Sequence, residues 1–155
     1  MKEGLVLLGV LLIAGSAMAA TGSQVDVAGP SSFGEQRDQV MADLSDGETY
    51  AEISPEDRAR VVSSLGRMER LLGTNASPQA LHPDDRVELM NEQERINNIL
   101  TRARADSRLV CRREVTVGSR MPTNVCRTVA ESRRVREDSR QRLEGAGRAR
   151  NNTLR

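Results

Sequence analysis

The stretch SPEDRARVVSSLGRMERLLG, from Ser54 to Gly73, sets the architecture of this chain. Ser54 can cap the free backbone amides of a helix, Pro55 suits the first helical position, and two carboxylates follow near the positive end of the helix dipole. Apolar side chains then recur at helical spacing, and Gly73 is placed to end the helix. We therefore predict an amphipathic helix of about 18 residues. Its predicted buried face consists of Val61, Leu65, Met68 and Leu72, widened by Val62 and Leu71.

A second helix start lies at Pro83, which two aspartates follow. We predict that this helix runs to about Asp106 and presents a broad apolar face, interrupted by Gln93 and Asn97. Because a short loop joins the two helices, they are expected to pack as an antiparallel hairpin. The predicted apolar face consists of Val87, Met90, Ile96, Ile99, Leu100 and Ala103.

The first nineteen residues are typical of a cleavable secretory signal. A polar start precedes an apolar run at residues 5–14, and Ala17-Met18-Ala19 forms a small-x-small site, after which we expect cleavage. The run is shorter than the about 20 apolar residues that a spanning helix needs, and no basic stop-transfer cluster follows it. An uncleaved anchor is the alternative. We predict an exported protein that begins near Ala20 and has no membrane span after signal cleavage.

Two β-favouring stretches at residues 109–117 and 124–129 flank a turn region that contains Gly118 and Pro122. Each stretch contains one of the two cysteines of the chain, Cys111 and Cys126. In an exported protein, two cysteines and no others imply an intramolecular disulfide. A zinc site would need two more ligands, and a redox pair usually has the Cys-x-x-Cys spacing, which is absent.

The remaining segments are assigned by composition. Residues 20–49 are predicted to be a flexible acidic leader with a short helix near 35–44, and residues 50–144 the small disulfide-stapled domain. A charged helix is predicted at 130–143, and a disordered tail at 145–155. The predicted fold class is therefore mostly α, with a helical hairpin, a disulfide-closed β-hairpin and a charged C-terminal helix.

The net charge near zero hides an asymmetry. Residues 1–100 contain 8 Lys and Arg against 16 acidic residues, whereas residues 101–155 contain 15 Arg against 6 acidic residues. Every cation after Lys2 is arginine, which either reflects a GC-rich genome or serves phosphate and carboxylate recognition through the planar guanidinium. The candidate residues for an anionic partner are Arg112, Arg113, Arg120 and Arg127 in the hairpin and Arg133, Arg136 and Arg140 on one face of the last helix.

The alternative interpretation of the last helix is a solvent-exposed helix whose charged side chains form ion pairs with one another along the helix. Glu137 lies four residues after Arg133, and Asp138 lies four residues from both Arg134 and Arg142. Pairs at this spacing stabilise an isolated helix by about 0.2–0.5 kcal/mol each. The basic row and the solvated helix are therefore competing interpretations of the same residues.

No set of residues points to catalysis. His82, the only histidine, precedes a proline and is expected to be exposed near a helix start. Ser119 lacks the Gly-x-Ser-x-Gly elbow, and Glu92 and Glu94 diverge on a helix. With only two aromatic residues and no tryptophan, stacking platforms for bases are also missing. We predict no enzyme activity, cofactor, metal or nucleic-acid partner.

The cysteine region resembles a pattern in small exported, periplasmic proteins of Gram-negative bacteria. The resemblance covers roughly Tyr50 to Arg142 and implies a periplasmic protein with Cys111 paired to Cys126. It implies no activity. It is carried by Cys111-Arg112-Arg113-Glu114, Gly118-Ser119-Arg120 and Val125-Cys126-Arg127-Thr128-Val129-Ala130-Glu131, and by similarity to one branch at residues 91–97 and 106–111.

Three functional hypotheses follow. The first is a non-enzymatic periplasmic binding or envelope-associated protein, whose arginine-rich hairpin contacts an acidic protein or an anionic envelope component. The second is a structural protein in which the acidic segment between Asp26 and Asp57 docks on the basic half and neutralises it. The third is an inhibitor of an envelope hydrolase. Oligomeric state is not predicted, because the apolar face of the second helix suits a twin as well as the first helix.

Overall fold

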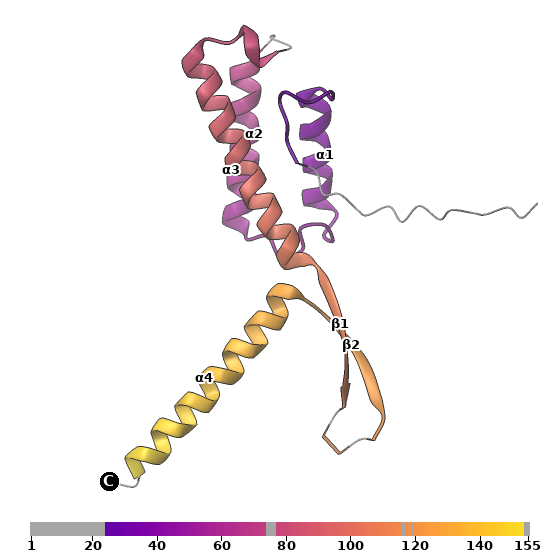
Figure 1. Cartoon of the computed structure of the whole chain (residues 1–155), viewed down its shortest axis with the longest axis vertical. Coiled ribbons are helices and arrows are strands. Elements are labelled where there is room, and N and C mark those ends of the chain that lie inside the picture. Colours follow the sequence, from indigo (N-terminus) through magenta and orange to yellow (C-terminus); the bar gives the residue numbers. More distant parts are fainter. Residues whose placement is uncertain (1–23, 74–76, 116, 119, 154–155) are drawn as a thin grey trace, which may run out of the picture.

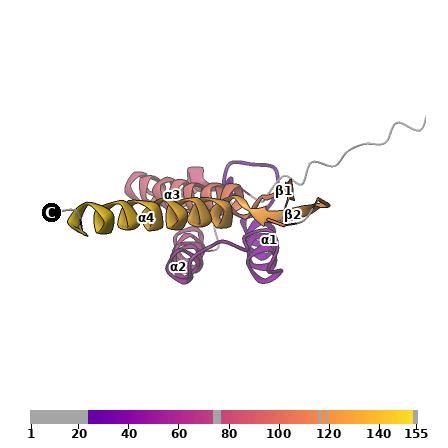
Figure 2. The ribbon, with the colours of Figure 1, turned by 90° about the horizontal axis from the view of Figure 1, so that it is seen from below.

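The computed structural model describes residues 24–73, 77–115, 117–118 and 120–153, so the predicted signal at 1–19 lies outside it. The described chain is mostly α with one two-stranded hairpin, which confirms the predicted fold class. Helices α1, α2 and α3 form a bundle, from which the β-hairpin and α4 project in different directions (Figures 1 and 2). The elements are α1 (Phe33–Ser45), α2 (Pro55–Leu72), the 3-10 turn η1 (Pro78–Ala80), α3 (Pro83–Ser107), β1 (Leu109–Val115), β2 (Pro122–Thr128) and α4 (Val129–Thr153).

Helix α2 forms as its end signals predict. The Ser54 hydroxyl accepts a hydrogen bond from the Asp57 amide at 3.0 Å, Pro55 takes the first turn, and Gly73 ends the helix with a φ of 52°. The predicted stripe from Val61 to Leu72 is buried, whereas Val62 is 42% exposed. The α2 helix therefore supplies one wall of the core.

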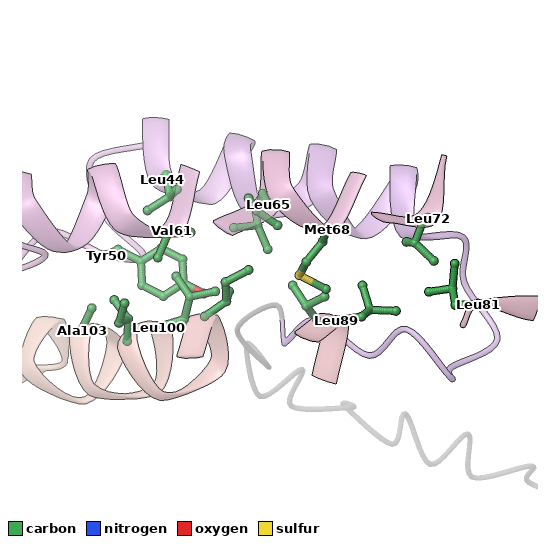
Figure 3. Close-up of a cluster of buried hydrophobic side chains, with 14 residues drawn as sticks. Leu44, Tyr50, Val61, Leu65, Met68, Leu72, Leu81, Leu89, Leu100 and Ala103 are labelled. Atoms are coloured by element: carbon green, nitrogen blue, oxygen red, sulfur yellow. The ribbon is translucent and has the colours of Figure 1, made fainter. Parts of the chain in front are cut away.

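Helix α3 supplies the opposite wall. The predicted face is confirmed at Ile96, Ile99, Leu100 and Ala103, which are buried, but not near the start of the helix. Val87 and Met90 are 60% and 39% exposed, so their assignment to the buried face was wrong, while Leu89 is fully buried. The face that meets α2 continues from Leu89 through Ile96 at spacings of three and four residues, and Val87 and Met90 lie off this line. The ring of Tyr50, from the α1–α2 connection, lies among Leu44, Val61 and Leu100 in the same core (Figure 3).

The short helix predicted near 35–44 is present as α1, but the described part of the predicted leader, residues 24–49, packs into the bundle instead of forming a flexible segment. Val25 is fully buried, and α1 contributes Val40 and Leu44 to the core. The side-chain amide of Asn97 donates to the Val25 carbonyl at 2.8 Å and accepts from the Val25 amide at 2.9 Å. Gln93 accepts from the Val27 amide at 2.9 Å. The two polar residues that interrupt the apolar face of α3 thus satisfy the backbone of the incoming segment.

The β-hairpin has strands of seven residues in antiparallel register, with Leu109 opposite Thr128 and Val115 opposite Pro122. Gly118, in the connecting turn, has a φ of 87°, a backbone conformation that residues with a Cβ rarely adopt. A two-stranded hairpin is marginally stable alone in water. We therefore expect the covalent link between its strands to contribute to its stability.

Helix α4 is longer than predicted, and the expected disordered tail at 145–155 is replaced by helix up to Thr153. Arg140 pairs with Glu144 at 2.8 Å, next to the predicted boundary, and the Arg and Ala residues beyond it favour helix, whereas Gly145 and Gly147 do not. Only the start of α4 touches the bundle, where Ala130 is buried. The remainder of α4 projects from the molecule. Among the described residues, no helix combines the length and the apolar character needed to cross a bilayer.

Candidate functional site

The disulfide between Cys111 and Cys126 is present, as predicted. The two residues lie directly opposite each other in the register of β1 and β2, with their Cα atoms 3.9 Å apart. Both residues are exposed, so the bond joins two strands that have no core of their own. The disulfide therefore fixes the pairing of the strands and with it the positions of the neighbouring arginines.

Three of the predicted site residues, Arg112, Arg113 and Arg120, are exposed on this hairpin, and none forms an ion pair within the described residues. Because successive side chains of a strand point to opposite faces, Arg112 and Arg113 lie on different faces of the hairpin. Arg120 lies in the turn region next to β2. The hairpin thus presents guanidinium groups on both faces and at its tip.

Arg127, the fourth predicted hairpin residue, is already occupied by carboxylates. Its Nη1 lies 2.7 Å from Glu114 Oε1 across the strands, and its Nε lies 3.8 Å from Glu131 Oε1. The hydrogen bond to Glu114 raises the pKa of the Arg127 guanidinium. Arg127 therefore serves the internal structure of the hairpin, which sequence spacing did not indicate.

The predicted row of arginines on α4 is not a continuous free surface. Arg133 forms two hydrogen bonds with Asp106, at 2.9 and 3.1 Å, and Arg140 pairs with Glu144. Arg136 is exposed and forms no ion pair within the described residues. Of the pairs predicted for a solvated helix, only the one between Arg142 and Asp138 is present as an ion pair, at 2.9 Å.

A polar junction, made of Glu52, Asp106, Ser107, Thr128, Arg133 and Arg134, joins the three parts of the molecule. Glu52, in the α1–α2 connection, accepts from Arg134 at 2.7 and 3.2 Å and from the Thr128 hydroxyl at 2.6 Å. Thr128 also accepts from the Glu131 amide at 3.0 Å and so caps α4. Ser107, at the end of α3, accepts from the Glu52 amide at 2.9 Å.

The carboxylates of the junction are held in their charged forms. The hydrogen bond from Arg134, followed by that from Thr128, lowers the pKa of Glu52. The hydrogen bond from Arg133 lowers the pKa of Asp106. Sequence reasoning missed this junction, although the spacing of Thr128 and Glu131 is that of a helix capping box. Nothing local in the sequence brings Glu52 to Arg134.

Glu92 is a second ionisable group that sequence reasoning did not place inside the molecule. Its residue is 3% exposed, between α2 and α3, and Arg95 Nη1 lies 2.6 Å from its Oε1. Burial raises the pKa of Glu92, but hydrogen bonds from Ser64 and Arg95 and the charge of Arg67 outweigh burial and hold the pKa below its usual value. Its position three residues after Leu89 is the signal that indicates burial.

A shallow groove of about 410 Å³ between α2 and α3 is lined by three arginines, Arg60, Arg95 and Arg102. Arg60 and Arg102 both pair with Asp57, at 3.2 and 3.0 Å, and Arg95 is engaged by Glu92. Each guanidinium group in the groove therefore already has a carboxylate partner. Within the described residues, no group of three or more His, Cys, Asp or Glu side chains is placed to hold a metal ion.

The sole histidine is exposed at the start of α3, as expected. Its Nδ1 accepts from the Asp84 amide at 3.4 Å, which makes His82 the N-cap of that helix. No protein-family model, no curated protein and no solved structure matches the chain.

Proposed function

We propose that this chain is an exported, periplasmic, non-enzymatic protein that binds an anionic partner through its disulfide-stapled hairpin. The observation that carries the proposal is the group of three exposed arginines, Arg112, Arg113 and Arg120, none of which has a carboxylate partner within the described residues. Unpaired guanidinium groups are suited to bidentate hydrogen bonds with carboxylates and phosphates. An acidic protein and an anionic envelope component both carry such groups.

The distribution of charge supports a partner that meets the hairpin end of the molecule. Residues 24–107 contain nine arginines and sixteen acidic residues, whereas residues 108–155 contain thirteen arginines and five acidic residues. The hairpin and α4 project away from the acidic bundle (Figure 1). An anionic surface is therefore attracted to the projecting parts and repelled by the bundle.

The predicted compartment agrees with the cysteine chemistry. Disulfides persist in the bacterial periplasm and are rare in the cytosol. A signal-like N-terminal segment, a disulfide between the only two cysteines and the resemblance to exported proteins of Gram-negative bacteria support export together.

A second candidate is a structural protein whose acidic and basic halves neutralise each other. Two ion pairs favour it, between Glu52 and Arg134 at 2.7 Å and between Asp57 and Arg102 at 3.0 Å. The exposed hairpin arginines have no part in these pairs. We therefore assign the first pair to the junction and the second to the packing of α2 against α3, and we propose the hairpin as the surface for an external partner.

The experiment compares retention on an immobilised acidic polypeptide, poly-glutamate, during a salt gradient. The protein is produced from Ala20 onward, which keeps every buried residue of the described chain. The test variant is Arg112→Gln/Arg113→Gln/Arg120→Gln, and the control with the same net charge is Arg58→Gln/Arg70→Gln/Arg86→Gln.

We expect the hairpin variant to elute at lower salt than both the wild type and the bundle control, because exposed ion pairs are screened by salt. Equal elution of the two variants contradicts the proposal, since retention then depends on net charge alone. Circular dichroism of both variants verifies that each is folded.

A further inference from the structure

One face of the hairpin carries all of its exposed apolar strand residues. Because every second residue of a strand lies on the same face, β1 presents four residues on the face that holds the disulfide: Leu109, Cys111, Arg113 and Val115. Leu109 is 66% exposed and Val115 is 63% exposed. The exposed disulfide lies between them, and Arg113 with Asn124 separates it from Val115; we call this side of the hairpin the disulfide face.

The fully exposed side chains of the other face are polar. This face carries Arg112 and the ion pair of Arg127 with Glu114, whose Nη1 and Oε1 atoms are 2.7 Å apart. Val110 and Val125 on this face are only partly exposed. The hairpin is therefore amphipathic, with its free apolar surface on one side.

The tip of the hairpin continues the apolar surface and adds positive charge. Val117 is fully exposed, at 101%, and Met121 is 77% exposed. Arg120 lies beside Met121, and Arg113 interrupts the disulfide face opposite Asn124. Apolar side chains with arginines among them are typical of segments that lie at the interface of an anionic membrane.

The projecting hairpin is accessible to a large flat surface. It runs away from the bundle in Figure 1, and in both views it diverges from α4 (Figures 1 and 2). Within the described chain, β2 meets the start of α4 only at the base of the hairpin, where the Val129 amide donates to the Arg108 carbonyl at 3.0 Å. The disulfide holds the two strands in one register and so keeps the apolar side chains on one side.

The size and charge of the disulfide face favour a lipid surface over a second copy of the chain. Seven residues of two strands cover about 23 Å by about 10 Å, roughly 230 Å². A stable protein interface buries about 800 Å² on each partner. A second copy would also bring the same positive charge of Arg113 to the interface, which opposes association. A bilayer needs no shape complementarity, and its phosphate groups match the guanidinium groups.

We infer that the disulfide face and the tip of the hairpin lie on an anionic lipid surface, with Leu109, Val115 and Val117 in the interfacial layer and Arg113 and Arg120 on phosphate groups. This inference rests on the proposed function, because it names the anionic partner as a lipid bilayer. The two kinds of side chain have different roles. The arginines are attracted electrostatically to the anionic surface, and the apolar side chains insert into the interfacial layer and retain the hairpin there.

The test uses co-sedimentation of the protein from Ala20 onward with phosphatidylglycerol/phosphatidylcholine vesicles and with phosphatidylcholine vesicles alone. The test variant is Leu109→Ser/Val115→Ser. The matched control, Val62→Ser/Val87→Ser, removes apolar side chains that are 42% and 60% exposed on the bundle. Retention on poly-glutamate is measured for all proteins in parallel.

We expect wild type to bind the anionic vesicles and not the phosphatidylcholine vesicles, and the test variant to lose about tenfold or more in affinity for the anionic vesicles. The control variant should stay within about twofold of wild type, and retention on poly-glutamate should not change. Equal vesicle binding by the two serine variants overturns the lipid inference but leaves the proposed function standing. Absence of binding to both vesicles and poly-glutamate overturns both.

A tryptophan reporter tests which face meets the lipid, because the chain contains no tryptophan. Val115→Trp places the indole on the disulfide face, and Thr123→Trp places it on the opposite face. With anionic vesicles we expect a blue-shifted emission and quenching by brominated lipid for Val115→Trp only. An equal response of both variants, or a response of Thr123→Trp alone, overturns the assigned orientation. Gel filtration without lipid tests pairing of two copies, and a stable dimer that is lost in Leu109→Ser/Val115→Ser also overturns the inference.

Discussion

Glu52 and Arg134 are 82 residues apart in the chain and form a two-pronged ion pair, with the Arg134 Nη1 atom 2.7 Å from Glu52 Oε2 and the Nη2 atom 3.2 Å from Oε1. Glu52 belongs to the connection between α1 and α2, and Arg134 belongs to the second turn of α4. Their pairing, with that of Asp106 and Arg133, sets where α4 leaves the bundle, because the described part of α4 buries little apolar surface. The junction is therefore held mainly by polar contacts.

Glu52→Gln should destabilise the junction. A glutamine removes the negative charge opposite Arg134 and one of the acceptor oxygens that Arg134 and Thr128 share, so we expect a loss of about 1–2 kcal/mol in the free energy of unfolding. Urea unfolding followed by circular dichroism measures it. Glu48→Gln, at an exposed position in the same connection, is the control and should change stability by less than about 0.5 kcal/mol. Equal effects of the two variants would contradict the assigned role of Glu52.

The stability of the protein should fall in acid partly through this junction. The pKa values of Glu52 and Asp106 are lowered in the folded state, so the unfolded chain binds their protons first as the pH falls. Their contribution is complete above their ordinary pKa values, near about 4, and is lost as the pH falls through the folded values. Urea midpoints between pH 7 and pH 3 should decline less steeply for Glu52→Gln/Asp106→Asn than for wild type. Parallel declines would show that the junction does not cause the loss of stability in acid and would indicate other carboxylates, such as Glu92, as the cause.

Asn97→Ala should release the N-terminal segment from α3. The substitution leaves the amide and the carbonyl of Val25 without the partners that now lie 2.9 and 2.8 Å away. We expect a loss of about 1–3 kcal/mol and faster hydrogen exchange at the Val25 amide. Asn98→Ala, one position further along α3 and exposed, is the matched control. Unchanged exchange at Val25 in Asn97→Ala would show that burial alone holds the segment.

Cys111→Ser/Cys126→Ser should loosen the hairpin while the bundle stays folded. The hairpin buries little apolar surface, and closing a loop of this size contributes about 3 kcal/mol in the chain-entropy model. Trypsin should cleave after Arg112 and Arg113 about tenfold or more faster in the double variant. Cleavage after Arg67, in the middle of α2, should stay slow and serves as the internal control. Equal cleavage at the hairpin in both proteins would mean that strand pairing alone is sufficient.

Local signals in the sequence were sufficient to predict the helices of the bundle and the disulfide between Cys111 and Cys126. Ser54, Pro55 and Gly73 mark the ends of α2 through capping and backbone preferences, which depend only on near neighbours. The two cysteines are the only partners available to each other, and their flanking β-favouring residues place the disulfide on a hairpin. The mostly-α class follows from these features, because helical spacing of apolar residues needs no tertiary information.

The tertiary structure alone decided how these parts meet. Periodicity predicted the buried side of α3 from Ile96 to Ala103 but not near its start, where Leu89 and Glu92 are buried instead of Val87 and Met90. The docking of Val25 on Asn97 and the pairing of Glu52 with Arg134 join residues 72 and 82 positions apart. Contacts over such distances depend on the geometry of the whole chain and leave no local pattern. For the same reason, the sequence could not distinguish Arg112 and Arg113 from Arg127. Only the packing of strands and helices showed which of these guanidinium groups already have a carboxylate partner.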